Sequence, residues 1–574
     1  MKIQFITSAF NGMAQRLWVE LDRLNHQVIV TYPNENLVSQ TQSIDPELII
    51  APFLTAKIPE VIWKNYVCMI VHPGIAGDRG ASSLDWAILR KRPVWGVTIL
   101  QAVEKMDAGP IWASVEFKMR DLTKGELYRH EVTQAAAKGI LQALQNFEQG
   151  DFKPTPLDYE NPNVKGRWNP KTKQKDFAFS WTDAVEDILR KIRAADSDPG
   201  VLVELDGQAF FAYGGHREGQ IQGGQGQILA QRNQAICVGA GAGAIWLTHL
   251  KSVEPGSIKL PAMLVLAQKN IPKSELSPFE SVDYPTWQEI RFEQEGEIGY
   301  LYFDFYNGAM STNQCQRLRE AIVEAKTKVQ MLVLMGGRDV WSNGIHLNVI
   351  EAAKNPAQES WENIHAIDDL ILEIINSTSH YIVAALQGNA GAGGVSLALA
   401  ADKVMTRNGI VLNPHTKNMG LYGSEYWTYL LPQRIGYKKA LRFTEDCLPW
   451  GVQVAYEVGL IDDYFGETNS EFVAEVKRKA LEIKHLPYFD KLIRAKKFQR
   501  RKDERDKTLA KYREEELEKM HKNFFDDDWD YSYKRFCFVH KIPDSTTQVA
   551  KDLYRTRREI YRKRKWERLD YDGE

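Results

Sequence analysis

The sequence lacks the features that would assign the protein to a nucleic-acid-binding, membrane or secreted class. Its 574 residues carry a formal net charge of −2, so no overall basic field favours binding to nucleic acid. No apolar run approaches the ~20 residues of a membrane-spanning helix, and Met1–Ile6 has the pattern of a strand rather than a signal peptide. The five cysteines include no CxxC pair, which indicates a reducing compartment, and no metal site is predicted. We therefore expect a cytoplasmic protein without nucleic-acid or membrane partners.

Length and patterning predict a multidomain α/β protein. A prior of ~100–200 residues per domain gives three or four domains. We place them at residues 1–155, 156–275 and 276–574. The first is predicted to be an open parallel sheet with covering helices, because short β-branched runs alternate there with amphipathic segments. The second follows a Pro-, Asn- and Lys-rich linker at 154–175 and is predicted to be a small antiparallel barrel.

The third domain is predicted to alternate strands and helices from residue 287 to residue 463. It then ends in a charged helical tail that includes Lys507–Lys522 and Tyr554–Arg568. The strands predicted in the first domain are Lys2–Thr7, Gln27–Thr31, Leu48–Ala51, Val67–Val71 and Gly96–Gln101, with a helix at Met13–Leu24. Ligands of an open α/β sheet bind beyond the carboxyl ends of its strands. His72 follows a predicted strand directly and is therefore a candidate site residue.

His72 and Asp107 form the first candidate catalytic pair. Transfer of a formyl group needs a general base for the nucleophile, and a carboxylate can orient a histidine for that role. In isolation the pair is weak evidence, since His72 can simply end a strand and Asp107 can cap a turn.

The motifs around this pair resemble those of the folate-dependent formyltransferases, such as methionyl-tRNA formyltransferase. They occur in family order at Val71–Gly74, Asp78–Gly80, Trp86–Leu89, Gly96–Ile99 and Met106–Ile111. Trp181–Ala184 and Ile192–Ala194 resemble the C-terminal barrel domain of that family, so the resemblance covers residues 1–260. It implies 10-formyltetrahydrofolate as a substrate and His72 and Asp107 as catalytic residues. The folate site that it implies includes Phe53, Leu54, Arg79 and Gly80.

One position departs from the formyltransferase pattern. The family has an asparagine two residues before the histidine, and this chain has Ile70 there. Either the site is an inactive relic or its acceptor needs less help. A thiol is partly ionised near neutral pH and intrinsically nucleophilic, whereas an amine is held as ammonium. We therefore favour a thiol acceptor.

Two glycine-containing loops later in the chain, Trp341–Ile345 with Gly344 and the glycine-rich Gly388–Gly394, are typical of an oxyanion hole. Either loop alone would equally suit a phosphate or tight packing. Together with Arg434–Gly436 and Ala455–Ile461 they resemble the crotonase (enoyl-CoA hydratase/isomerase) family over residues 290–480. The resemblance implies that the amides of Ile345 and Gly393 polarise a thioester carbonyl. The coenzyme A site that it implies includes Gly344, Gly391, Gly394 and Ser396.

The two glutamates of the hydratases are missing. Alignment on the glycines places Ser396 at the first of their positions and His415, approximately, at the second, which argues against hydration of an enoyl group. The candidate catalytic residues that remain are His415, Tyr422, Glu425 and Tyr426. Each of them could equally be a packed aromatic or a surface acid.

The combination of both halves resembles the HypX (HoxX) family of nickel–iron hydrogenase maturation factors across essentially the whole chain. That resemblance implies formyl transfer from 10-formyltetrahydrofolate to coenzyme A, then decarbonylation of formyl-CoA to carbon monoxide, the iron ligand of the hydrogenase. It implies hydrogenase maturation proteins as partners besides the small molecules. Two alternatives stay open. One is a formyl-CoA or acyl-CoA hydrolase, or an amine formyltransferase, with a half that only binds coenzyme A; the other is a non-catalytic scaffold.

Overall fold

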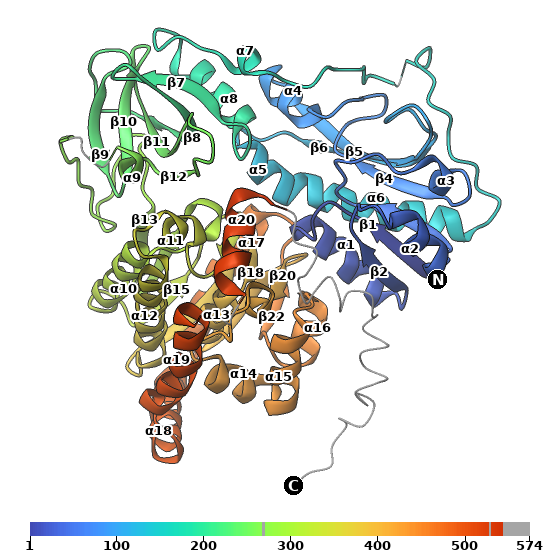
Figure 1. The fold of residues 1–574 in the computed structure, drawn as a ribbon. Coiled ribbons are helices and arrows are strands. Elements are labelled where there is room, and N and C mark those ends of the chain that lie inside the picture. The colour runs from blue at the N-terminus through green and yellow to red at the C-terminus, as the bar shows by residue number, and fades with distance from the viewer. Residues whose placement is uncertain (163, 267–269, 527–529, 543–574) are drawn as a thin grey trace. The chain divides into compact units, whose positions relative to one another are not determined.

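The structure, a computed structural model, describes residues 1–162, 164–266, 270–526 and 530–542 (Figure 1). The chain forms two compact units. The first contains residues 1–179 and 190–201, and the second contains residues 180–189 and the described chain from residue 202 onward. The predicted helical segment Tyr554–Arg568 lies outside the described residues. The predicted domain boundaries at residues 155 and 275 stay predictions.

The first unit is built on a six-stranded sheet in the order β2–β1–β3–β4–β5–β6. Its strands are β1 (Lys2–Ile6), β2 (Gln27–Thr31), β3 (Leu48–Ala51), β4 (Cys68–His72), β5 (Val94–Gln101) and β6 (Ile111–Lys118). The fold class is confirmed, but the expectation of a wholly parallel sheet is wrong for β5, which is antiparallel to both of its neighbours. β1 to β4 are parallel, whereas β5 runs against β4 and β6 runs against β5. The loop at 102–110 is too short for the crossover of a dozen or more residues that a parallel pair needs.

Helices pack around this sheet. They are α1 (Gly12–Arg23), α2 (Leu37–Ile44), α3 (Glu60–Trp63), α4 (Ser83–Leu89), α5 (Lys124–Leu127), a π-helical turn (Tyr128–Val132), α6 (Thr133–Glu148) and α7 (Gln174–Phe177); α8 (Val185–Ala195) has residues in both units. The side chain of Asn11 caps α1 by accepting a hydrogen bond from the amide of Ala14. Ile188, Leu189 and Ile192 on one face of α8 are fully buried.

The second unit begins with an antiparallel sheet in the order β7–β8–β11–β10–β9, with β12 paired to β11. The elements of this part are β7 (Val201–Leu205), β8 (Gln208–Glu218), β9 (Ile228–Arg232), β10 (Ala235–Ala240), β11 (Gly243–Ser252), β12 (Leu260–Pro261) and α9 (Ala262–Val265). Their antiparallel pairing agrees with the predicted small β domain.

The rest of the second unit contains two further sheets. One has the order β13–β14–β15–β17–β19–β22, and a smaller one has the order β16–β18–β20–β21. Their strands are β13 (Ile290–Glu295), β14 (Ile298–Phe303), β15 (Met331–Leu334), β16 (Val340–Ser342), β17 (Tyr381–Leu386), β18 (Asn389–Gly391), β19 (Lys403–Arg407), β20 (Val411–Asn413), β21 (Trp450–Gly451) and β22 (Asp463–Phe465). β16, β18 and β20 run parallel, so the predicted glycine-rich loops belong to one small sheet.

The remaining helices of the second unit lie between these strands and after them in the chain. They are α10 (Thr312–Lys326), α11 (Leu347–Ala352), α12 (Pro356–Ile375), α13 (Gly393–Leu399), α14 (Trp427–Ile435), α15 (Tyr437–Asp446), α16 (Val452–Glu457), α17 (Asn469–Lys484), α18 (Phe489–Asp506), α19 (Leu509–Phe525) and α20 (Tyr531–His540). One core contains residues of α10, α12 and α19, and the other contains Phe472, Val476 and Ala480 of α17. The predicted helix Lys507–Lys522 is α19, and the expected helical C-terminal region is confirmed for the described residues.

Candidate active sites

His72, the last residue of β4, lies between two carboxylates. Its Nε2 is 3.0 Å from Oδ2 of Asp78, and its Nδ1 is 3.8 Å from Oδ1 of Asp107. The side chains of His72 and Asp78 are buried. The structure therefore brings the predicted pair His72 and Asp107 together. It adds Asp78, which sequence reasoning included only within a motif, and the hydrogen bond between Asp78 and Nε2 fixes the orientation of the imidazole.

Asn169 holds Asp78 from the other side. Its Nδ2 donates a hydrogen bond to Oδ1 of Asp78 at 3.1 Å, and both side chains are buried. A Cβ on Gly74 would lie 2.6 Å from Nε2 of His72, so glycine leaves room for this network. Asn169 lies in the segment that composition predicts to be only a linker, and no motif marked it. A row of Asn169, Asp78, His72 and Asp107 is therefore the geometric core of the first site.

The residues predicted for the folate site lie on loops that are hydrogen-bonded to their neighbours. The carbonyl of Phe53 accepts a hydrogen bond from the amide of Ser8 at 2.7 Å, which joins the ends of β1 and β3. Arg79 Nε donates to the carbonyl of Met106 at 2.9 Å, and the amide of Gly80 donates to Oδ2 of Asp107 at 3.2 Å. Binding of folate by Phe53, Leu54, Arg79 and Gly80 stays a prediction.

Ile70 occupies an apolar environment. Its side chain packs with Leu54 in a cluster of hydrophobic residues, and its backbone pairs with Ala51 of β3 and Leu100 of β5. Ile70 is only partly buried, so water can reach its side chain. The position of the family's asparagine is thus apolar and half-buried in this chain.

The two glycine-rich loops of the second unit meet. A Cβ on Gly344 would lie 3.2 Å from the amide nitrogen of Gly393, and Nε1 of Trp341 donates to the carbonyl of Gly394 at 3.0 Å. Gly344 has a φ of +75°, a left-handed conformation that glycine adopts at no steric cost. Gly393 is the first residue of α13, so its amide has no helical acceptor. The amides of Ile345 and Gly393 thus lie on facing loops, as an oxyanion hole requires.

Glu425 lies against these loops. A Cβ on Gly393 would overlap Oε1 of Glu425, so the carboxyl group lies directly beside the α-carbon of Gly393. Glu425 is only 4% exposed, and its Oε2 accepts a hydrogen bond from the amide of Ser424 at 2.8 Å. Burial, together with the nearby charge of Asp368, raises the pKa of Glu425 to about 8. A carboxyl group with this pKa can accept or donate a proton near neutral pH.

The backbone that carries Glu425 is strained and held by two buried acids. Glu425 and Tyr426 are consecutive residues with φ of +62° and +58°, a conformation that non-glycine residues rarely adopt. Asp368 of α12 accepts from the amide of Glu425 at 2.9 Å, and Glu516 of α19 accepts from the amide of Tyr426 at 2.9 Å. Burial raises the pKa of Asp368 to about 7 and that of Glu516 to about 8. No sequence motif indicated either anchor.

His415 also approaches the loops. Its Cε1 would lie 3.1 Å from a Cβ on Gly391, and its Nδ1 is 2.7 Å from the carbonyl oxygen of Asn413. Since a carbonyl oxygen only accepts, Nδ1 carries the proton and Nε2 is left as an acceptor. Burial lowers the pKa of His415, which favours this neutral form. Oδ1 of Asn343 lies on the same side of Gly391, 2.6 Å from the Cβ position, and sequence reasoning missed it.

The other predicted residues of the second site lie elsewhere in its surroundings. Tyr422 packs against Trp427, with Nζ of Lys519 4.0 Å from its ring centroid. Tyr426 is buried and lines a basic pocket between α12, α18 and α19. Ser396 is buried in α13. The catalytic roles predicted for Tyr422 and Tyr426, and the binding role predicted for Ser396, stay predictions.

Two general properties of the described residues bear on function. In that part of the chain, no three or more His, Cys, Asp or Glu side chains are grouped so that they could hold a metal ion. The described helices include none whose length and hydropathy suit a membrane crossing.

Comparison with known proteins places both halves in families. Residues 171–261 match the formyl transferase C-terminal domain, and residues 306–541 match the enoyl-CoA hydratase/isomerase family. Over 245 residues the chain is 28% identical to methionyl-tRNA formyltransferase from Streptococcus equi subsp. equi, which covers 42% of this chain and 76% of that enzyme. The two predicted kinds of domain are therefore present in one polypeptide.

Two similar proteins span nearly the whole chain. Hydrogenase maturation factor HoxX from Bradyrhizobium diazoefficiens is 41% identical over 566 residues, which cover 97% of this chain and 98% of the relative. The crystal structure of HypX from Aquifex aeolicus in complex with tetrahydrofolic acid is 43% identical and superposes with a TM-score of 0.92. That match covers 96% of this chain and 98% of the other.

Proposed function

Since the chain belongs to the HypX/HoxX family of hydrogenase maturation factors, we propose that it makes carbon monoxide from a formyl group in two steps. In the first step, 10-formyltetrahydrofolate gives its formyl group to coenzyme A. In the second, formyl-CoA is decarbonylated, and the carbon monoxide becomes the iron ligand of a nickel–iron hydrogenase, with hydrogenase maturation proteins as partners. The two domains in one chain and the tetrahydrofolate bound to the Aquifex aeolicus relative support this proposal.

The first step takes place at His72. The thiol sulfur of coenzyme A attacks the formyl carbon, and His72 takes the thiol proton as the new C–S bond forms. The C–N bond to N10 of the folate then breaks, and the proton passes to that nitrogen, so that tetrahydrofolate and formyl-CoA are released. Asp78 accepts a hydrogen bond from Nε2 of His72 and orients the ring, and Nδ1, which lies 3.8 Å from Asp107 and beyond hydrogen-bond distance, is the nitrogen that takes the proton. The thiol needs little further activation, which is consistent with Ile70 in place of an asparagine.

The second step differs from ordinary chemistry of the enoyl-CoA hydratase/isomerase family. Formyl-CoA has no α-carbon, so an enolate cannot form. A base removes the hydrogen of the formyl carbon as a proton, the C–S electron pair leaves with sulfur, and carbon monoxide is released. The thiolate then takes back a proton, so the step is redox-neutral and needs no further reactant. Exclusion of water prevents the competing hydrolysis to formate.

Glu425 beside Gly393 is the observation that carries the proposed second step. A thioester oxygen held by the amides of Ile345 and Gly393 places the formyl carbon next to this buried carboxyl group. Glu425 then takes the formyl proton and returns it to the thiolate, a role that its raised pKa suits. The neutral His415 offers a second polar side chain beside the loops, at Gly391.

Incubation with 10-formyltetrahydrofolate and coenzyme A, followed by haemoglobin spectroscopy, tests the proposal against its alternatives. Spectral conversion to carbonmonoxy-haemoglobin supports the two-step reaction. Formate without carbon monoxide indicates a formyl-CoA hydrolase, and a formylated amine indicates an amine formyltransferase with a coenzyme A-binding half. Absence of turnover with folded protein indicates a scaffold.

A further inference from the structure

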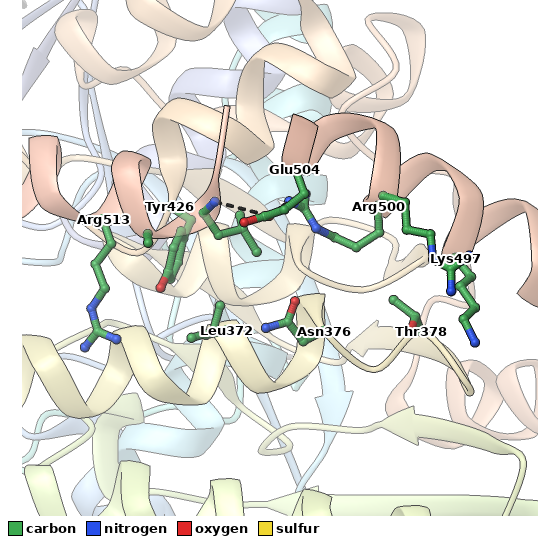
Figure 2. A pocket seen from close by; sticks show the side chains of 11 residues that line it. Leu372, Asn376, Thr378, Tyr426, Lys497, Arg500, Glu504 and Arg513 are labelled. Atoms are coloured by element: carbon green, nitrogen blue, oxygen red, sulfur yellow. Dashed lines mark hydrogen bonds and ion pairs between the residues drawn. The ribbon is translucent and has the colours of Figure 1, made fainter. Parts of the chain in front are cut away.

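A basic pocket lies between α12, α18 and α19 of the second unit, next to the turn that carries Glu425. Its volume is about 520 Å³, within the range of small-molecule sites. Figure 2 shows Arg513 at one end and Lys497 at the other, with Tyr426, Asn376 and Arg500 between them. All of these residues belong to one unit, so a single compact body forms the pocket. The proposed reaction leaves it without a role.

The lining of this pocket has an excess of positive charge. It contains Lys497, Arg500, Arg501 and Arg513 against a single acid, Glu504. Arg500 is paired with Glu504, and Arg513 is paired with Asp368 and Asp369. Lys497 and Arg501 are exposed, and neither has a partner among the residues that the structure describes. Two cations of the lining therefore lack a counter-charge.

The rest of the lining is neutral or apolar. Asn376 and Thr378 at the end of α12 supply neutral polar groups, and Leu372, Leu509 and the buried Tyr426 supply apolar surface. An arginine fork recognises phosphoryl oxygens through paired, charge-assisted hydrogen bonds, and a nearby lysine adds a point charge. An apolar surface beside such a cluster suits the organic part of a phosphate ester.

We propose that this pocket is a binding site for a phosphorylated small molecule, whose phosphoryl groups lie between Lys497 and Arg501 and whose organic part lies on Leu372, Leu509 and Tyr426. The site is distinct from the glycine-rich loops, since Glu425 contacts Gly393 whereas its neighbour Tyr426 lines the pocket. The inference goes beyond the proposed production of carbon monoxide and does not depend on it.

Contacts connect this pocket to Glu425. Arg513 lines the pocket, and its Nε is 3.6 Å from Oδ2 of Asp368, the acid that holds the amide of Glu425. The charge of Arg513 opposes the burial that raises the pKa of Asp368. Arg513 and Tyr426 therefore link the wall of the pocket to the strained turn at Glu425 and Tyr426.

Titration calorimetry of the full-length protein with ATP, and separately with inorganic pyrophosphate, tests the site. The double variant Lys497→Gln/Arg501→Gln removes the two unpaired cations, both of which are exposed, so the fold is retained. Loss of charge-assisted hydrogen bonds to phosphate should weaken binding roughly tenfold or more. The matched control is Arg494→Gln/Lys502→Gln, which makes the same change of charge on exposed residues of α18 outside the pocket lining.

The proposal requires saturable binding that the pocket variant weakens and the control variant does not. If ATP binds more tightly than pyrophosphate, the apolar surface takes part in recognition. If the two affinities are equal, the phosphoryl groups alone account for binding. Equal losses in both double variants, or no saturable heat with either probe, overturn it. Because ATP resembles part of coenzyme A, binding of ATP that is insensitive to Lys497→Gln/Arg501→Gln counts as binding elsewhere and also overturns the proposal.

Discussion

At the scale of single residues, the first site includes a carboxylate, that of Asp78, which the sequence motif did not single out. His72 and Asp107 follow from the resemblance to formyltransferases, but Asp78 lies closer to the imidazole than Asp107 does, at 3.0 Å against 3.8 Å. Asn169 completes the row from a segment that composition describes only as a linker. Local residue patterns predict helices and strands, but they do not show which distant segments of the chain come into contact in the folded protein.

Replacement of Asp78 by asparagine tests the positioning role of this second carboxylate. The variant keeps the shape of the side chain but removes the charged acceptor at Nε2 of His72, so formyl transfer should slow by roughly 10–100-fold. The rate of tetrahydrofolate formation measures the effect. Asp121→Asn is the control because Asp121 is exposed in the same unit. Equal rates in both variants would show that Asp78 does not position His72.

The raised pKa of Glu425 predicts the pH dependence of the second step. Removal of the formyl proton needs the carboxylate form, which is the minor form below about pH 8. The rate of carbon monoxide release from supplied formyl-CoA should therefore rise with pH and level off above about 8. Glu425→Gln should lower this rate by about 10²–10⁴-fold at all pH values. A flat pH profile, or a variant as active as the natural chain, would contradict the assignment.

At the scale of elements, Gly393 at the start of α13 must lack a side chain. A Cβ there would overlap Oε1 of Glu425, so Gly393→Ala should displace the carboxyl group and disturb the oxyanion hole. One oxyanion donor is typically worth ~10²–10³ in rate. Decarbonylation of formyl-CoA should fall by about that factor, while formyl transfer stays intact. Gly243→Ala in β11 is the control, since a Cβ there meets nothing closer than 3.8 Å. Unchanged decarbonylation by Gly393→Ala would argue against this role.

The buried acids that join α12 and α19 to the turn predict how stability changes with pH. The pKa values of Asp368, Glu425 and Glu516 are raised to about 7, 8 and 8, above the ~4 of an unfolded chain. Between these limits the folded state binds more protons than the unfolded state, so stability should fall as pH rises, by up to about 1.4 kcal/mol per pH unit for each group.

Denaturant unfolding between pH 5 and pH 8 measures this slope. Glu516→Gln should reduce it, because one of the three acids no longer titrates. Glu518→Gln, an exposed position on the same helix, should leave the slope as it is. Stability that increases with pH over this range would show that the three carboxyl groups are ionised when the protein is folded.

Sequence patterns predicted the helices and strands well where apolar residues recur with a single period, either that of a strand or that of a helix. The bounds of β2 and β3 agree to the residue, and α1 differs from its prediction by one residue at each end. The direction of β5 was wrong, because short buried strands look alike whether they are parallel or antiparallel. At the second site the glycines were predictable, whereas Asp368 and Glu516 sit in ordinary helical patterns whose burial only the fold reveals.

At the scale of the whole molecule, the two proposed reactions belong to separate units. The row of residues around His72 lies in the first unit, and the glycine loops with Glu425 lie in the second. His72→Ala should therefore abolish consumption of 10-formyltetrahydrofolate and leave decarbonylation of supplied formyl-CoA unchanged, as measured by haemoglobin spectroscopy. Loss of both reactions in a folded variant would contradict this division.

The central claim is that the formyl carbon of the folate leaves the protein as carbon monoxide. The most direct measurement supplies 10-[13C]formyltetrahydrofolate with coenzyme A and follows 13CO on haemoglobin by infrared spectroscopy. We expect one labelled carbon monoxide for each tetrahydrofolate formed, with coenzyme A regenerated rather than consumed. Labelled formate, or a labelled formyl group on an amine, in place of 13CO would contradict it.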